Sequence, residues 1–258
     1  MCGQVQQMTI NIAPEKELSV SEVFGPTIQG EGRSQGRTVV FLRLGLCNLD
    51  CTWCDTPYTW DWLGKNGVKY DKHVEIHRIG LSVLTQDLVI RCGTTCNRVV
   101  ISGGEPMIQQ TNLAMLIENL FEHGITCEIE TNATIMLNEQ MLALHEAGAV
   151  DFNCSPKLEN SGVELSNRRK PEALQMYAET NSMFKFVVSN EQDITEIEEM
   201  LATVLTNVPP YNIYIMPEGT TQEKILPQLQ WAFDIASKRG WSLSPRLHVL
   251  AYNDKRGI

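Results

Sequence analysis

The sequence predicts an α/β fold built around a parallel sheet. Runs of Val, Ile, Leu and Phe recur along the chain, and segments with the apolar spacing of an amphipathic helix lie between them. Strands that alternate with helices are typical of βαβ units, and from residue 98 onward each unit takes about 25 to 35 residues, which is the length that a right-handed crossover needs. A parallel barrel, complete or partial, fits this pattern best, and an open doubly wound sheet has the same periodicity.

The predicted elements follow one another without a Ser/Gly-rich linker, so we expect residues 1–258 to form one domain. The first two strands are continuous in apolar residues and end in glycine. We interpret the looser segment 58–97 between them as an insertion on the first βα connection. The prediction is strands at 38–45, 98–104, 126–131, 149–155, 183–189, 212–219 and 246–252, and helices at 81–93, 107–124, 138–148, 191–205 and around 221–240.

The composition favours a small-molecule role in the cytoplasm. No run of eighteen apolar residues occurs, and residues 1–17 lack a basic segment followed by an apolar one, so we expect neither a membrane span nor an export signal. A net charge of −10 opposes non-specific attraction to a phosphate backbone, so direct binding of nucleic acid is not expected.

Eight cysteines are present, and three of them fall within eight positions. In a chain of this length without an export signal, such clustering favours metal ligation in a reducing compartment over disulfides. The other five are interpreted mainly as small buried apolar residues, and the pair Cys92 and Cys96 is assigned to packing or to incidental oxidation: Cys2, Cys92, Cys96, Cys127 and Cys154.

The three clustered cysteines, Cys47, Cys51 and Cys54, have the spacing C-x3-C-x2-C and directly follow the strand predicted at 38–45. Sites in parallel sheets lie at the carboxyl ends of the strands, so this loop should face a site. A structural zinc ion or a ferredoxin-type cluster needs a fourth ligand, and the nearest candidates are far downstream. A cluster held by three cysteines instead leaves one iron open for catalysis. The downstream candidates for a zinc site are His73, His77, Cys92 and Cys96.

Polar residues also follow three later predicted strands, as SGGEP (102–106), ETN (130–132) and CSPK (154–157). Glu105 places a carboxylate where a ligand ammonium can be held, Ser155 can bond a carboxylate or a ribose, and Lys157 can pair with a carboxylate. Alone, SGGEP is also typical of a strand-to-helix turn, and ETN is equally well explained as a capped loop.

The cysteine motif, with an aromatic residue before its last cysteine and GGE about fifty residues later, resembles the signature of the radical S-adenosylmethionine (SAM) superfamily. The resemblance implies a partial (β/α)6-type parallel barrel and a 4Fe-4S cluster whose open iron binds SAM. One electron from the cluster then cleaves SAM to a 5′-deoxyadenosyl radical, which abstracts hydrogen from a substrate. Trp53 would offer a flat apolar surface to the adenine.

Three further features, PTIQGEG (26–32), an arginine inside the first predicted strand and CNLDCTWCDT (47–56), resemble the 7-carboxy-7-deazaguanine synthase family. That resemblance implies conversion of 6-carboxy-5,6,7,8-tetrahydropterin to 7-carboxy-7-deazaguanine with loss of ammonia, in queuosine-type 7-deazapurine biosynthesis. It also implies Mg²⁺, a homodimer and an electron donor such as flavodoxin. The implied residues are Cys47, Cys51 and Cys54 for the cluster, Thr56 for Mg²⁺, Trp53, Asp55, Gly104, Glu105, Ser155, Pro156 and Lys157 for SAM, and Ile28, Gln29, Gly30, Glu31, Arg43 and Ser102 for the substrate.

The residue chemistry agrees with these roles. Arg43 lies among apolar neighbours and needs a partner, which a substrate carboxylate would supply, while a glutamine side chain suits a pterin amide edge. Thr56 alone is a weak Mg²⁺ ligand, so the ion should bind together with the substrate. Arg246 and His248 either complete the substrate pocket or belong to a solvated terminal strand. Two other functions compete, an activase that installs a glycyl radical on a protein and a zinc-stabilised binding module.

Overall fold

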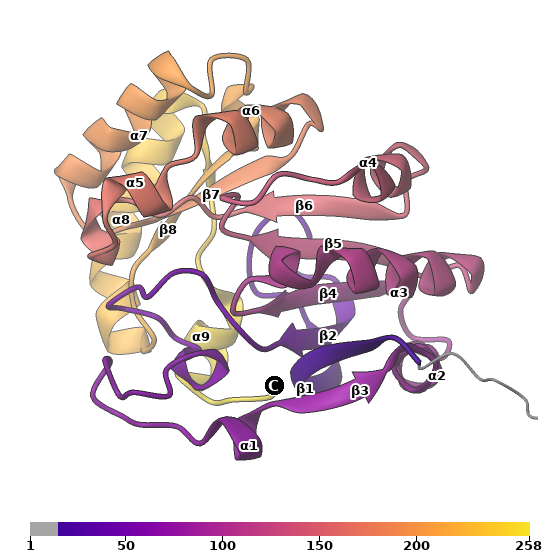
Figure 1. Cartoon of the computed structure of the whole chain (residues 1–258). Coiled ribbons are helices and arrows are strands. Elements are labelled where there is room, and N and C mark those ends of the chain that lie inside the picture. Colours follow the sequence, from indigo (N-terminus) through magenta and orange to yellow (C-terminus); the bar gives the residue numbers. More distant parts are fainter. Residues whose placement is uncertain (1–14) are drawn as a thin grey trace, which may run out of the picture.

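The computed structural model describes residues 15–258, in which one mixed sheet carries nine strands in the order β3-β1-β2-β4-β5-β6-β7-β8-β9 (Figure 1). Neighbouring strands from β2 to β9 are parallel, whereas β1 is antiparallel to both β2 and β3. The sheet has two free edges, so the barrel is partial, as predicted. The strands are β1 (Glu17–Ile28), β2 (Thr38–Leu44), β3 (His77–Gly80), β4 (Arg98–Gly103), β5 (Thr126–Thr131), β6 (Val150–Cys154), β7 (Met183–Val188), β8 (Ile213–Pro217) and β9 (Ser242–Leu243).

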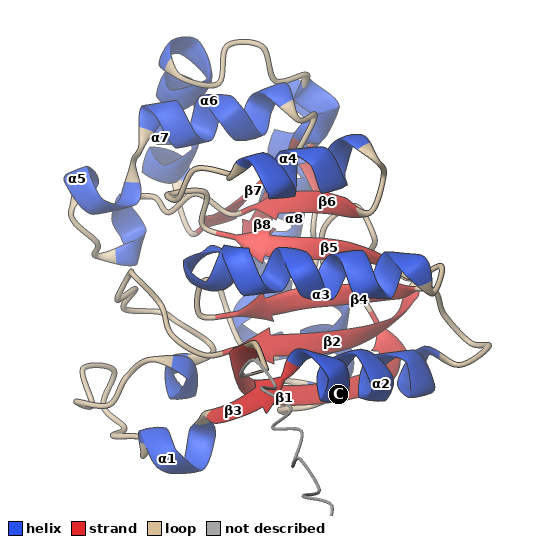
Figure 2. Cartoon of the chain, turned by 45° about the vertical axis from the view of Figure 1, so that its right-hand side comes forward, coloured by secondary structure: helices blue, strands red, loops and turns tan. Residues whose placement is uncertain are grey.

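The longer helices connect successive strands, and α2, α3 and α4 lie side by side on the outer face of the sheet (Figure 2). Side-chain caps fix where several of them begin: Asn138 caps α4, Thr221 caps α8, and Asn190 forms a capping box at the start of α7. The helices are α1 (Lys72–Glu75), α2 (Leu81–Cys92), α3 (Gln110–Glu122), α4 (Glu139–Glu146), α5 (Leu165–Arg168), α6 (Pro171–Glu179), α7 (Glu191–Thr203), α8 (Gln222–Arg239) and α9 (Leu247–Tyr252), with short 3-10 turns at η1 (Pro57–Thr59), η2 (Pro106–Gln109), η3 (Glu159–Ser161) and η4 (Pro210–Asn212).

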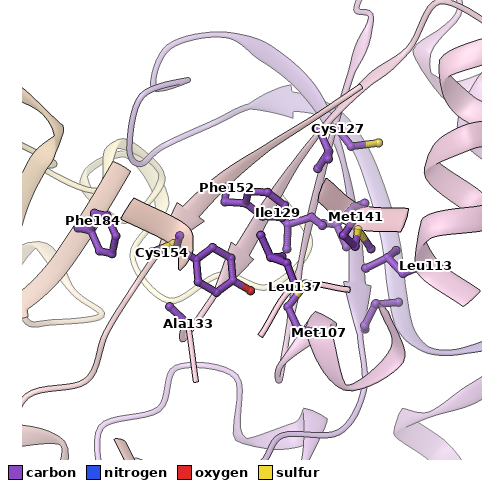
Figure 3. Packing of buried hydrophobic residues seen from close by; sticks show 14 of the residues in the cluster. Met107, Leu113, Cys127, Ile129, Ala133, Leu137, Met141, Phe152, Cys154 and Phe184 are labelled. Carbon is purple, nitrogen blue, oxygen red and sulfur yellow. The ribbon is translucent and has the colours of Figure 1, made fainter. Parts of the chain in front are cut away.

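The main hydrophobic core fills the space between the sheet and these helices. Ile129 and Phe152 project from the sheet toward Leu113 of α3 and Met141 of α4, and all four are buried (Figure 3). Tyr177 of α6 packs edge-on against Phe152, with ring centroids 5.3 Å apart. Each such side chain contributes about 1.5–3 kcal/mol of burial free energy. Burial of these side chains therefore determines which face of each strand packs against the helices.

The period-two alternation of the strands leaves polar side chains on the inner face. In β7, Phe184, Phe186 and Val188 belong to the outer core, whereas Lys185 between them faces inward. The same alternation points Arg43 of β2, Ser102 of β4 and Glu130 of β5 into a common cavity. The apolar pattern of the strands therefore also positions the polar site.

The predicted strands and helices up to residue 240 are present with small differences at their ends, but the prediction of a strand at 246–252 is wrong. This segment forms α9, and Arg246, directly before the helix, has a left-handed backbone conformation (φ 57°). The sheet already ends at β9, and the amide of Leu247 donates to the carbonyl of Gly30, so the segment is held by the loop after β1. The sequence analysis also missed β1, whose apolar alternation is interrupted by two register shifts against β2.

No helix in the described part of the chain is long and apolar enough to cross a membrane. The seven cysteines that the structure describes are free thiols, and Cys92, Cys127 and Cys154 are buried in the main core as predicted. Cys96 packs against that core, and Cys2 lies outside the described residues.

Candidate functional site

A cavity of about 280 Å³ lies at the carboxyl ends of the parallel strands. Its wall combines the loop after β1, the cysteine loop after β2, the ends of the later strands and the C-terminal segment. All but two of the site residues that the family resemblance implied line it: Ile28, Gln29, Gly30, Glu31, Arg43, Cys47, Cys51, Trp53, Cys54, Asp55, Thr56, Ser102, Gly104, Ser155 and Lys157. Glu105 and Pro156 are buried beside the cavity but do not line it.

The cysteine loop is held against the end of β4 by backbone contacts. The amide of Gly104 donates to the carbonyl of Leu44 (3.0 Å) and that of Glu105 to the carbonyl of Leu46 (2.7 Å). A Cβ atom at Gly104 would lie 2.0 Å from the Leu46 oxygen, so only glycine permits this approach. The glycines of SGGEP thus bring two backbone segments together, which fixes the position of the cysteines.

The three cysteines share one end of the cavity, where Leu49 and Val163 pack against them. Burial raises the pKa of all three thiols, that of Cys47 to about 12. A thiolate at these positions therefore needs a bound cation to offset the cost of burial.

The spacing of these thiols does not suit a single metal ion. Within residues 15–258, no three His, Cys, Asp or Glu side chains come close enough together to hold one. His73 and His77, the candidate zinc ligands, are exposed and do not line the cavity. Three cysteines that line one cavity, with no fourth protein ligand found beside them in the described residues, fit the donor set of an open polynuclear cluster better than a four-ligand zinc site.

Glu105 has a different environment from the one expected of a ligand-binding carboxylate. It is fully buried, and its oxygens accept hydrogen bonds from the Met107 amide (3.0 Å), the Thr131 hydroxyl (2.7 Å) and the Asn132 amide (2.7 Å). Burial raises the pKa of Glu105 above its ordinary value, and the three hydrogen-bond donors offset only part of that rise. Glu105 thus caps η2 and ties SGGEP to ETN, an arrangement that positions Asn132 at the cavity wall.

Lys157 and Trp53 face each other across the same end of the cavity. The Lys157 ammonium donates to the carbonyl (2.9 Å) and the hydroxyl (3.0 Å) of Ser155 and lies 5.6 Å from the centroid of the Trp53 ring. The Trp53 indole donates to the side chain of Asn160 (3.2 Å), which fixes the orientation of the ring. A cation, a hydroxyl and an apolar ring therefore lie next to the three thiols.

Arg43 lines the same cavity, where the structure gives it a protein partner that the sequence did not reveal. Its Nε donates to Glu22 (2.7 Å), and no hydrogen bond between residues 15 and 258 engages its two terminal nitrogens. Burial raises the pKa of Glu22, but Arg43 and a second arginine, Arg256, lower it overall. Phe24 and Phe41 stack beside Arg43 with centroids 4.9 Å apart, so an open guanidinium fork borders a flat apolar surface.

A buried charge network joins the loop after β1 to the C-terminal part of the chain. Glu31 pairs with Lys185 and with Arg246 Nε (2.8 Å), and Arg246 also pairs with Asp55 and donates to the carbonyl of Gly219 (2.6 Å). Burial raises the pKa of Glu31, but the two cations hold it well below its ordinary value. His248 lies 3.7 Å from Glu31. Arg246 and His248 both line the cavity, which resolves their two interpretations in favour of the pocket.

The floor of the cavity is also polar. The Gln29 amide nitrogen faces Glu130 (3.3 Å) and Glu128 (3.5 Å), and its oxygen accepts from the amide of Glu31 (3.2 Å). The side chain of Gln29 is therefore bound within the protein, whereas Glu130 presents its carboxylate to the cavity. Lys185, inside the apolar run MFKFVV, carries the same signal that singled out Arg43, a lone cation in a buried strand.

Residues 253–258 form the last part of the wall, close to β1 (Figure 1). Arg256 pairs with Glu22 (3.0 Å) and Glu75 (2.9 Å), and its guanidinium lies 3.7 Å from the centroid of the Tyr58 ring. The Tyr58 hydroxyl donates to Glu22 (3.1 Å). The C-terminal segment is thereby attached to the same carboxylate that orients Arg43.

Comparisons with known proteins agree with this geometry. The model of the Radical SAM superfamily matches residues 43–160. The chain is 33% identical to the 7-carboxy-7-deazaguanine synthase of Pyrobaculum aerophilum, over 93% of this chain and 97% of that protein, and 32% identical to the protein of that name from Escherichia coli K12, over 90% and 97%. The crystal structure of QueE from Escherichia coli superimposes with a TM-score of 0.65 at 27% identity, over 88% of this chain and 92% of that one. Cysteine loop, partial barrel and near full-length similarity lead to one conclusion: the chain belongs to the 7-carboxy-7-deazaguanine synthase family of the radical SAM superfamily.

Proposed function

We propose that the chain is the radical SAM lyase that converts 6-carboxy-5,6,7,8-tetrahydropterin to 7-carboxy-7-deazaguanine with release of ammonia. It is an enzyme with a 4Fe-4S cluster and SAM as cofactors and a role in 7-deazapurine biosynthesis of the queuosine type. The observation that carries the proposal is that one cavity is lined both by the three clustered thiols and by Arg43, whose terminal nitrogens are open. A pterin carboxylate at Arg43 would extend its ring toward the cofactors.

At the cofactor end, we propose that Cys47, Cys51 and Cys54 hold the cluster. Cluster and SAM together supply a 5′-deoxyadenosyl radical when bound. Trp53 offers its ring to the adenine, and the Lys157 ammonium is placed to pair with the methionyl carboxylate. The further proposed SAM contacts are Asp55, Gly104 and Ser155.

The proposal revises the roles of Glu105 and Pro156 at this end of the cavity. Three protein donors leave about one of the four acceptor positions of the Glu105 carboxylate, so we propose that Glu105 positions Thr131 and Asn132 and also contacts SAM. Pro156 lies between Ser155 and Lys157 and sets the course of their loop.

At the substrate end, the terminal nitrogens of Arg43 bind the carboxylate as a bidentate pair, and the stacked Phe24 and Phe41 accept the ring. The Glu130 carboxylate suits the N–H groups of the pyrimidine edge. Gln29 acts on substrate through Glu130, because its own amide is bound. The remaining proposed contacts are Ile28, Gly30, Glu31 and Ser102.

The proposal extends to four features of the whole enzyme. Mg²⁺ would bind at Thr56 together with substrate oxygens. We propose a homodimer, a one-electron donor such as flavodoxin, and a reducing cytoplasmic location, the last supported by the free thiols between residues 15 and 258. We also propose a single domain over residues 1–258, supported by the one sheet of the described part. Since α2 packs as the crossover helix against β2 and β4, we place the added material of the 58–97 insertion before it.

An anaerobic turnover assay tests the proposed function. Iron-loaded protein given 6-carboxytetrahydropterin, SAM, Mg²⁺ and a reductant should release the deazapurine and regenerate SAM. No product from a fully loaded enzyme would refute the lyase. Irreversible consumption of SAM without pterin would indicate the activase, and stoichiometric zinc without iron after anaerobic purification would indicate the binding module.

A further inference from the structure

The indole of Trp60 donates a hydrogen bond to one of the three clustered cysteines. Its Nε1 lies 3.3 Å from the Cys54 sulfur, within the range of an N–H···S contact. An indole nitrogen is a donor only, so the proton points at the sulfur whichever charge the sulfur carries. The hydroxyl of Thr56 is farther from the same sulfur, at 3.7 Å.

The position of Trp60 is built into the fold. The amides of Trp60 and Asp61 donate to the Pro57 carbonyl (3.1 and 2.7 Å), and the buried Asp61 carboxylate accepts from the amides of residues 64–66. The side chain of Asn66 then donates to the carbonyl of Cys51 (3.1 Å). Residues 57–66 therefore fold back over the cysteine loop, and these hydrogen bonds place the Trp60 backbone beside that loop without a ligand.

Trp53 provides an internal comparison. It precedes Cys54 directly, lines the same cavity and is partly buried like Trp60. Its indole N–H nevertheless donates to Asn160 and is not directed at a sulfur. Proximity to the thiols alone therefore does not produce an N–H···S contact. Trp60 differs from Trp53 in directing its indole N–H at a cysteine sulfur.

We propose that Trp60 raises the reduction potential of the cluster through its hydrogen bond to the Cys54 sulfur, an inference that rests on the proposed cluster ligation. Reduction adds one electron and breaks no bond, and the electron comes from a one-electron donor. The added charge spreads onto the sulfurs, so a donated N–H stabilises the reduced form more than the oxidised form. Hydrogen bonds to cluster sulfurs are among the factors that set such potentials.

The test is an EPR-monitored redox titration of anaerobically loaded holoenzyme without SAM or pterin. Trp60→Phe keeps an aromatic ring and removes the donor, so the equilibrium constant for reduction should fall about three- to tenfold, where tenfold corresponds to 59 mV for one electron. Trp53→Phe, the matched control, should leave the potential unchanged. An unchanged potential in iron-loaded Trp60→Phe, or an equal shift in both variants, would overturn the inference.

A second measurement needs no substitution. Wild-type holoenzyme labelled with 5-fluorotryptophan carries a more acidic indole N–H, so the reduction potential of its cluster should shift upward. An unchanged potential in the labelled protein would overturn the inference even if Trp60→Phe fails to load iron. Failure of wild type to bind any cluster would overturn both the inference and the proposed function. Loss of pterin turnover with the potential shift intact would overturn only the lyase.

Discussion

Removing the Arg246 guanidinium should lower the free energy of unfolding more than breaking an exposed ion pair does. Arg246→Met keeps the length of the aliphatic chain, but it leaves the buried carboxylate of Glu31 with Lys185 as its close cation and leaves Asp55 and the Gly219 carbonyl without this donor. Both residues would have the same left-handed backbone at this position, so the substitution tests the charge rather than the conformation.

The magnitude follows from the burial of each partner. Breaking a buried pair costs about 3–5 kcal/mol. We expect the lower end, about 3 kcal/mol, because Lys185 still faces Glu31 and because the Asp55 side chain is 45% exposed and adds little. For a chain of this size, about 2–4 °C in Tm per kcal/mol gives a decrease of about 6–12 °C.

The assay is anaerobic thermal unfolding of the iron-loaded enzyme at one scan rate. Arg239→Met is the control, since Arg239 pairs with the half-exposed Glu198 and should lower Tm by only about 2 °C. If Arg246→Met unfolds within 2 °C of wild type, the network does not carry the assigned free energy.

Three further predictions test other parts of the site. Arg43→Gln should raise KM for the pterin about ten- to hundredfold, with a smaller effect on turnover in steady-state kinetics, because a charged hydrogen-bond pair to the carboxylate is lost; equal KM values would refute the contact. Burial favours the protonated form of Glu31, but its cation partners hold its pKa in the folded protein well below 4.5. As the pH is lowered, Glu31 is therefore protonated first in the unfolded chain, and the free energy of unfolding measured in urea should fall through about pH 4.5. Glu31→Gln should flatten this decline. Gly104→Ala should abolish iron loading because its Cβ would overlap the Leu46 carbonyl. Gly67→Ala carries the strain of a positive φ (89°) but meets no neighbouring atom, so it should lose stability and still load iron; normal iron content in Gly104→Ala would refute the packing argument.

Local patterns in the sequence were sufficient to predict most of the fold and the centre of the site. Apolar runs with period two identify the strands, and a lone Arg43 within such a run identifies a residue that points away from the core. The cysteine spacing, placed directly after a strand, locates the loop that faces the cavity. These signals lie within a few residues of each other, so no knowledge of the tertiary contacts is needed.

The features that escaped prediction depend on contacts between distant segments. Glu31 and Arg246 are 215 positions apart, and only the folded chain reveals that they pair. The same pairing fixes residues 247–252 as a helix where the alternation of apolar residues favoured a strand. The motif SGGEP likewise does not show that Glu105 accepts hydrogen bonds from Thr131 and Asn132, which lie 26 and 27 positions downstream.

The course of the C-terminal segment has a practical consequence for protein production. Residues 253–258 form part of the cavity wall, and Arg256 anchors them to Glu22 and Glu75. A purification tag or reporter fused after Ile258 would therefore begin at the mouth of the substrate cavity and compete with that anchor. Comparing substrate affinity between the untagged and the C-terminally tagged protein would measure how much this wall contributes to binding.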